Sequence, residues 1–112
     1  LAKKGVTFMI FPGKRGGFIP PADLLLALGR RGLASVLVEG GPETWGAFLN
    51  AGCADRFILY MAPMLLGGER RAFAALAPAR LREPLRLKNI SIGRVGPDMV
   101  IEGEIIHTLK MV

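Results

Sequence analysis

The chain has 112 residues, of which 51% are hydrophobic and 21% charged, a size and composition that fit one globular domain and exclude a disordered chain. No apolar run reaches the ~18 residues that a membrane-spanning helix needs, so we expect a cytoplasmic protein with no membrane partner. The net charge of +6 is scattered over separate predicted elements without interleaved aromatic residues, which argues against nucleic acid as a partner.

The sequence contains one cysteine, Cys53, and one histidine, His107. An intramolecular disulfide and a His/Cys zinc cluster are therefore impossible within this chain, and we predict no metal site. Cys53 is predicted to be a small buried hydrophobe, and His107 is predicted to lie at the surface.

The first predicted elements are a strand and a helix. Residues 6–11 are rich in β-branched and aromatic side chains, which is typical of a strand. Prolines at 20 and 21 and Asp23 suit a helix N-terminus, and Gly32 is the predicted left-handed cap at its end. Between these elements, the basic loop at residues 14–17 is either a phosphate clamp or a solvated surface loop, and both interpretations stay open.

Residues 35–44, with the sequence Ser-Val-Leu-Val-Glu-Gly-Gly-Pro-Glu-Thr, turn an apolar strand directly into a helix. We predict a buried parallel strand over residues 33–39, with Glu39 placing a carboxylate at its end. The two glycines permit a sharp turn and close approach of a ligand to the backbone, and Pro42 suits the first helical position. Ligands bind outside the carboxyl ends of strands in open α/β sheets, so the stretch predicts a ligand site. A tight turn without a ligand is the alternative.

The helix that follows, over residues 42–51, carries Trp45, Phe48 and Leu49 on one face, a spacing typical of core packing. Glu43 suits the helix dipole but repels a phosphate, so we expect a neutral or hydrogen-bonding edge of the ligand nearest to it.

A further strand is predicted over residues 55–62, because the run is apolar on both faces. Its expected partner is the strand at 33–39, in parallel, through a right-handed crossover. That pairing would place Leu66 and Gly67 at the same sheet edge as Glu39, although a hydrophobic loop that closes the core is an equal alternative.

The C-terminal region predicts a short helix over residues 69–77 and then a β-hairpin, with arms at 85–92 and 99–106. A phase shift in the first arm predicts a β-bulge near Asn89. With that bulge, Lys88 would face Glu102, and Arg86 would face Glu104. Together these elements predict an α/β domain with a mixed sheet.

Four of these segments resemble the reductase domain of the bifunctional riboflavin-biosynthesis deaminase/reductase. They are Val-Leu-Val-Glu-Gly-Gly-Pro at residues 36–42, the helix at 45–50, Gly-Cys-Ala-Asp-Arg at 52–56 and Tyr-Met-Ala-Pro-Met-Leu-Leu-Gly-Gly at 60–68. The resemblance implies a dihydrofolate-reductase-like fold, in which a mixed sheet has flanking helices and a C-terminal β-hairpin. Residues 1–112 would be the C-terminal part of a single reductase domain and a fragment of a longer chain.

The resemblance also implies a function, the NADPH-dependent reduction of 5-amino-6-(5-phosphoribosylamino)uracil to its ribitylamino product in riboflavin biosynthesis. Glu39 would bind the substrate, and no catalytic residue is assigned. The cofactor-binding residues implied by the resemblance are Gly40, Gly41, Pro42, Glu43, Thr44 and Trp45. The implied partners are the phosphorylated pyrimidine, a second copy in a homodimer, the N-terminal half of the domain and a deaminase domain in the parent protein.

Two alternatives to this function remain. The chain could be a non-catalytic fold fragment or dimerisation module, whose terminal hairpin pairs edge to edge with a second copy. It could also be part of a dihydrofolate-reductase-like reductase that acts on another substrate, because fold does not fix function.

Overall fold

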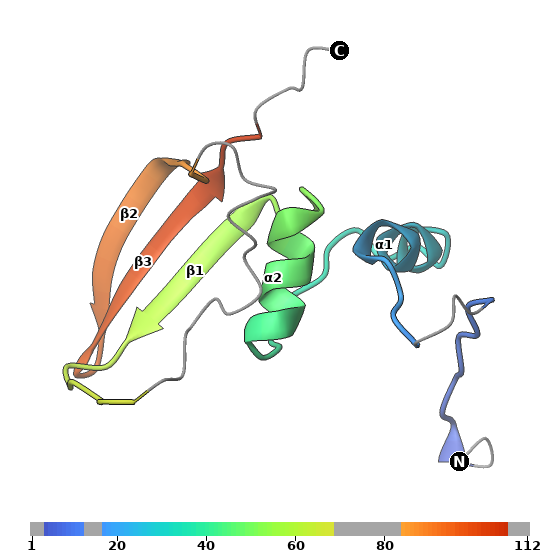
Figure 1. Cartoon of the computed structure of the whole chain (residues 1–112), viewed down its shortest axis with the longest axis horizontal. Helices are drawn as coiled ribbons and strands as arrows, with labels where there is room; N and C mark the ends of the chain where they lie inside the picture. The colour runs from blue at the N-terminus through green and yellow to red at the C-terminus, as the bar shows by residue number, and fades with distance from the viewer. Residues whose placement is uncertain (1–3, 13–16, 69–83, 108–112) are drawn as a thin grey trace. The chain divides into compact units, whose positions relative to one another are not determined.

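A computed structural model describes residues 4–12, 17–68 and 84–107. These residues form two helices, α1 (Pro21–Gly29) and α2 (Pro42–Asn50), and three strands, β1 (Arg56–Met61), β2 (Leu87–Val95) and β3 (Asp98–Ile105) (Figure 1). The chain divides into two units, Leu1–Val36 and Leu37–Val112. Helices and strands together confirm the predicted α/β class. The short helix predicted over 69–77 and residues 14–16 of the basic loop lie outside the described residues.

The first unit contains α1, whose ends follow the sequence signals. Pro21 occupies the start of the helix and Asp23 lies in its first turn. At the other end, Gly32 adopts φ +82°, its N–H donates to the Gly29 carbonyl at 2.9 Å, and the Leu33 N–H donates to the Leu28 carbonyl at 3.3 Å. These two bonds satisfy carbonyls that the helix end leaves open, and they confirm the predicted left-handed cap.

The predicted strands over residues 6–11 and 33–39 are wrong for the described chain, because neither segment forms a ladder with another described strand. A β-strand needs a neighbouring strand to pair with its backbone N–H and C=O groups. An apolar segment without such a neighbour leaves these groups and its side chains exposed. Leu37, predicted to be buried, has 74% of its surface exposed.

Helix α2 in the second unit begins at Pro42, as predicted, and ends in a Schellman motif. The Gly52 N–H donates to the Leu49 carbonyl at 3.1 Å and the Cys53 N–H donates to the Phe48 carbonyl at 3.0 Å, with Gly52 at φ +65°. Within this motif Cys53 is half-buried, less than predicted, and its thiol contacts the Ala51 carbonyl at 3.6 Å.

The sheet has the strand order β1-β3-β2, and both pairings are antiparallel. Strand β1 therefore lies at an edge of the described sheet, and its expected parallel pairing with residues 33–39 is wrong here. The pairing of β1 with β3 places Phe57 opposite Gly103 and Leu59 opposite Ile101. These pairs share one face of the sheet, because residues directly opposite each other in a ladder point to the same side.

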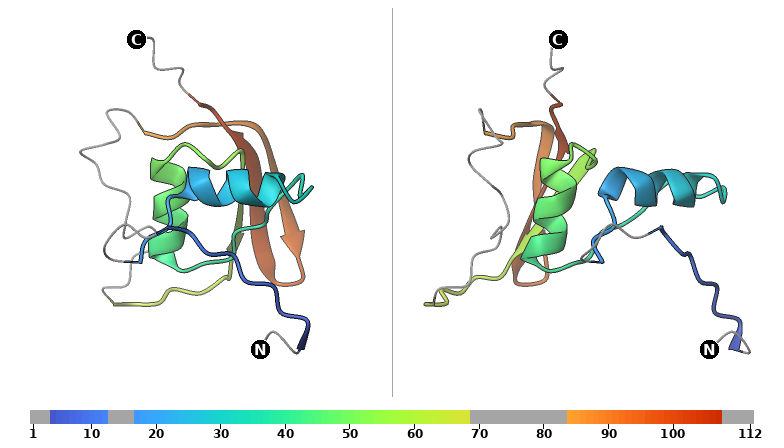
Figure 2. Two further views of the ribbon diagram at one scale, coloured as in Figure 1. Left: turned by 90° about the vertical axis from the view of Figure 1, so that its right-hand side faces the viewer. Right: turned by 45° about the vertical axis from the view of Figure 1, so that its right-hand side comes forward.

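Helix α2 lies along one face of the sheet beside β1, as both views in Figure 2 show. The most buried apolar side chains described in this unit are Phe48 of α2, 8% exposed, and Ile105 of β3, 6% exposed. The Ile105 N–H donates to the Asp55 carbonyl at 2.8 Å and so extends the β1–β3 ladder by one bond. Phe48 thus belongs to the core predicted from the helical stripe, whereas Trp45 lies nearer the surface.

The hairpin of β2 and β3 is confirmed, but its turn is shorter than predicted. Val95 pairs with Asp98, so the loop contains only Gly96 and Pro97. Gly96 has φ +59°. A two-residue hairpin loop with positive φ at the first position and a proline-fixed negative φ at the second matches a type II′ turn, whereas type I′ would need positive φ at both.

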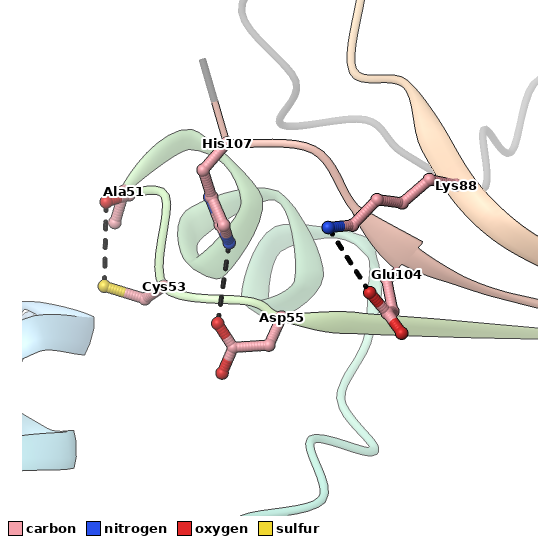
Figure 3. Close-up of polar contacts among 6 residues, drawn as sticks. All are labelled: Ala51, Cys53, Asp55, Lys88, Glu104 and His107. Atoms are coloured by element: carbon pink, nitrogen blue, oxygen red, sulfur yellow. Dashed lines mark hydrogen bonds and ion pairs between the residues drawn. The ribbon is translucent and has the colours of Figure 1, made fainter. Parts of the chain in front are cut away.

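The predicted bulge is confirmed at Asn89, and the predicted charge pairs are wrong by two residues. The register shifts between Lys88 and Ser91, and Asn89 adopts φ +50°. Because the tight turn advances β3 along β2, Lys88 lies opposite Glu104 instead of Glu102. The Lys88 Nζ and Glu104 Oε2 atoms are 3.6 Å apart (Figure 3).

The bulge also lowers the pKa of Glu104, chiefly because the Asn89 side chain donates a hydrogen bond to its carboxylate; the positive charge of Lys88 acts in the same direction. A carboxyl with a lowered pKa in the folded state stabilises the fold above its unfolded pKa and loses this contribution as the pH falls through the folded value.

Replacement of Asn89 by glycine is expected to raise the pKa of Glu104 toward the ordinary value of 4.5, because glycine keeps the left-handed backbone but donates no side-chain hydrogen bond. A carbon-detected NMR titration of the Glu104 carboxyl checks this. An unchanged midpoint in Asn89→Gly would show that Asn89 is not the main cause.

Candidate functional site

The candidate site is the turn from Val38 to Gly41 together with the first turn of α2. Gly41 precedes the helix with an extended backbone, φ −74° and ψ −179°, and no side chain caps the helix start. The first helical bond runs from the Trp45 N–H to the Gly41 carbonyl at 3.1 Å. Pro42 has no N–H, and within the described residues the N–H groups of Glu43 and Thr44 have no backbone acceptor. Two oriented donors are therefore available to a ligand at the positive end of the helix dipole.

Gly40 is held close to the helix that follows it. A Cβ atom built on Gly40 would lie 2.5 Å from the Thr44 Cβ and 2.7 Å from its Cγ2, whereas one built on Gly41 would meet nothing within 4 Å. A side chain at position 40 would have no space, so glycine is required there, whereas a side chain at position 41 would meet no steric obstacle.

Gly40→Ala is expected to destabilise the fold by about 1–3 kcal/mol, because the added methyl group overlaps the Thr44 side chain and forces the turn away from the helix. Gly41→Ala is the matched control and should cost about 1 kcal/mol or less, as an ordinary change at a helix N-cap. Urea unfolding of both variants checks the difference. Equal losses in the two variants would contradict the contact between Gly40 and Thr44.

Trp45 joins the two halves of the turn. Its indole N–H donates to the Val38 carbonyl at 3.3 Å, so a side chain in the first turn of α2 reaches back to the residue before Glu39. Sequence spacing alone indicated only a core position for Trp45. The bond depends on how sharply the glycines turn the chain, which the sequence pattern does not specify.

Glu39 itself is exposed, and it makes no hydrogen bond or ion pair with any other residue that the structure describes. A carboxylate with no partner among the described residues can accept hydrogen bonds from a ligand.

All the site residues predicted from the sequence lie in this one segment, which covers Glu39 and the cofactor-binding residues Gly40, Gly41, Pro42, Glu43, Thr44 and Trp45. The parallel sheet edge expected to bring Leu66 and Gly67 to Glu39 is not found among the described strands. The described residues also contain no group of three or more His, Cys, Asp or Glu side chains that could hold a metal ion.

A polar depression of about 220 Å³ lies at the bulge of the hairpin, which sequence analysis did not single out. It is lined by Arg56, Asn89, Ser91, Glu102, Gly103 and Glu104. Its charges are paired, since Arg56 contacts Glu102 within the lining and Glu104 contacts Lys88, which is not part of the lining. A depression whose charges are already balanced offers less to a charged ligand than the open start of α2 does.

His107 lies at the surface, as predicted, but it has a partner. Its Nε2 atom is 3.5 Å from Asp55 Oδ1 (Figure 3). The antiparallel pairing of β1 with β3 brings these sequence-distant residues together. None of the described helices has the length and hydropathy to cross a membrane.

Comparison with known proteins matches most of the chain to a protein family. The family model described as RibD C-terminal domain matches residues 2–101. The chain is 41% identical over 81 residues to the riboflavin biosynthesis protein RibD of Mycobacterium tuberculosis H37Rv, an alignment that covers 72% of this chain and 23% of that protein. It is 38% identical over 97 residues to RibD of Escherichia coli K12, with 86% and 26% covered.

A further relative is 5-amino-6-(5-phosphoribosylamino)uracil reductase of Buchnera aphidicola subsp. Acyrthosiphon pisum. It is 32% identical over 78 residues, which is 69% of this chain and 38% of that protein. The chain thus spans about a quarter of the length of the two RibD relatives.

Proposed function

The chain belongs to the RibD C-terminal domain family, and on this basis we propose that it is the C-terminal part of a reductase domain acting in riboflavin biosynthesis. The proposed reaction is the NADPH-dependent reduction of 5-amino-6-(5-phosphoribosylamino)uracil to the ribitylamino product. The relative named for this reductase supports the substrate. The observation that carries the proposal is the start of α2, where available N–H donors lie next to a carboxylate that has no partner among the described residues.

The residues at the start of α2 fit a nicotinamide cofactor through backbone contacts. The N–H groups of Gly41, Glu43 and Thr44 are not taken by backbone acceptors among the described residues, and they can donate to carbonyl or ribose oxygens. The carboxylate of Glu43 opposes a phosphate at the same place, so the fit favours a neutral part of the cofactor there. When bound, NADPH would supply the hydride, and the protein supplies binding, orientation and exclusion of water.

The proposed role of Glu39 is to bind the pyrimidine substrate. Its carboxylate can accept hydrogen bonds from amino or amide N–H groups of the pyrimidine, and it can stabilise positive charge on an imine by Coulomb attraction. Reduction of the ring-opened imine adds a hydride to the sugar carbon bonded to nitrogen and a proton to the nitrogen. Glu39 is not assigned as the donor of that proton.

The exposed apolar side chains of the two predicted strands support a larger domain. Val6, Phe8, Ile10, Val36 and Leu37 are all exposed among the described residues. We infer that the remainder of a dihydrofolate-reductase-like domain, with a mixed sheet, covers these segments, because exposed apolar segments are stabilised when partners bury them. A homodimer, a preceding deaminase domain and a cytoplasmic location complete the proposal.

The test is a reaction of the full-length protein with the phosphoribosylaminopyrimidine and NADPH that carries deuterium at the transferred position. The expected product is the ribitylamino compound with one deuterium on the sugar carbon attached to nitrogen, detected by mass spectrometry and NMR. Unlabelled product, or no product while a different carbonyl or imine substrate is reduced, would instead favour a reductase with another substrate.

A further inference from the structure

Two consecutive residues of α2 clamp the turn before the helix. Thr44 fills the space that any side chain on Gly40 would occupy, and the indole N–H of Trp45 donates to the Val38 carbonyl at 3.3 Å. The two contacts lie on either side of Glu39. The residue between them is thus restrained from both directions along the chain.

The Trp45 hydrogen bond acts on Glu39 through a single peptide group. The carbonyl of Val38 and the N–H of Glu39 belong to the same planar unit, so fixing the carbonyl fixes the plane from which the Glu39 side chain departs. Since Glu39 makes no side-chain interaction with other described residues, the described protein restrains it only through its backbone. The hydrogen bond from Trp45 therefore restrains the point on the backbone from which the Glu39 side chain extends toward a ligand.

We propose that Trp45 is a positioning residue for Glu39, acting through its indole N–H on the Val38 carbonyl. This inference rests on the proposed function, in which Glu39 binds the pyrimidine. It differs from the role implied by the family resemblance, which puts Trp45 in the cofactor pocket. The two roles predict opposite outcomes for the two ligands.

The test compares Trp45→Phe with the wild type in the full-length protein. Phenylalanine keeps an aromatic ring but has no N–H donor. The expected result is a rise of about three- to tenfold in KM for the pyrimidine, the size of one lost neutral hydrogen bond, with the Kd of NADPH unchanged. In a Glu39→Gln background the same substitution should have little further effect, because residues that act through one another are not additive.

A second measurement is made on the wild-type protein, and the variant serves only to assign one resonance. Trp45 is the only tryptophan of this chain, so its indole N–H gives one assignable NMR resonance, identified in the full-length protein by its loss in Trp45→Phe. Slow exchange of this proton with water is expected if it is hydrogen-bonded. Exchange as fast as in a free indole would overturn the proposal.

The kinetic outcomes separate this inference from the proposed function. Weakened NADPH binding with an unchanged pyrimidine KM would overturn the positioning role and return Trp45 to the cofactor site. Additive effects of Trp45→Phe and Glu39→Gln in a working reductase would overturn it as well. Absence of turnover in the wild type would overturn the proposed function first, and with it the role of Glu39.

Discussion

Glu39→Gln in the full-length protein is expected to lower kcat/KM for the phosphoribosylaminopyrimidine by about a hundredfold, the scale of a lost charge-assisted interaction at a site of this kind. Glutamine keeps the length of the side chain and one acceptor oxygen, so the loss isolates the charge. Steady-state kinetics with the pyrimidine varied at saturating NADPH measure the effect. The Kd of NADPH should change by less than about twofold, because the cofactor is assigned to backbone N–H groups.

Glu43→Gln is the matched control, because it makes the same chemical change four residues along the same segment. Glu43 is exposed in the first turn of α2. The substitution removes the negative charge of Glu43, and with it a repulsion toward phosphate and a favourable interaction with the helix dipole, each a small effect. We expect kcat/KM for the pyrimidine to stay within about threefold of wild type, the range of such surface charges. Equal losses in both variants would contradict a specific role for Glu39.

Phe48→Ala is expected to lower the free energy of unfolding of the chain by about 3 kcal/mol, through lost apolar burial and the cavity left between α2 and the sheet. Phe48, 8% exposed, and Ile105, 6% exposed, are the most buried apolar side chains described in the second unit. The Schellman bond to the Phe48 carbonyl uses the backbone and should survive. The loss therefore reports on side-chain packing.

The control for this prediction is Ile92→Ala in β2, a side chain that is 74% exposed. Its truncation should change stability by no more than about 0.5 kcal/mol. Urea unfolding with an unchanged m-value in both variants checks the comparison. If Ile92→Ala lowered the free energy of unfolding as much as Phe48→Ala, the core would not lie between α2 and the sheet.

The elements that sequence analysis predicted correctly are those fixed by neighbouring residues. Pro21 and Gly32 bound α1, Pro42 starts α2, and the phase shift near Asn89 predicted a bulge that is present. Capping, proline geometry and strand alternation act within a few residues, so the sequence displays them directly.

The predictions that failed depend on partners distant in sequence. Residues 33–39 have the composition of a strand, yet a ladder also needs a neighbour, and β1 pairs with β3 instead. The predicted register of the hairpin was wrong because the turn contains only Gly96 and Pro97, whereas the alternation pattern suggested a longer turn. A shift in turn length moves every cross-strand pair, including that of Lys88 with Glu104.

For the candidate site, the glycines, proline and carboxylate of residues 35–44 predicted a ligand site, and the family resemblance implied the cofactor-binding residues 40–45. The contact of Gly40 with Thr44 and the bond from Trp45 to Val38 could not be predicted, because both depend on backbone angles at the turn. The pairing of His107 with Asp55 depends in turn on the β1–β3 ladder.

We propose that the start of α2 binds the nicotinamide cofactor, and the direct test is a titration of the protein with NADPH that is followed through the backbone amide resonances. The expected result is saturable chemical-shift changes that are largest for the amides of Gly41, Glu43 and Thr44 and that persist in Glu39→Gln. Saturable shifts confined to other parts of the protein would contradict this proposal. So would the absence of saturable binding up to about millimolar NADPH, because a Kd of that size corresponds to a binding free energy of only about −4 kcal/mol.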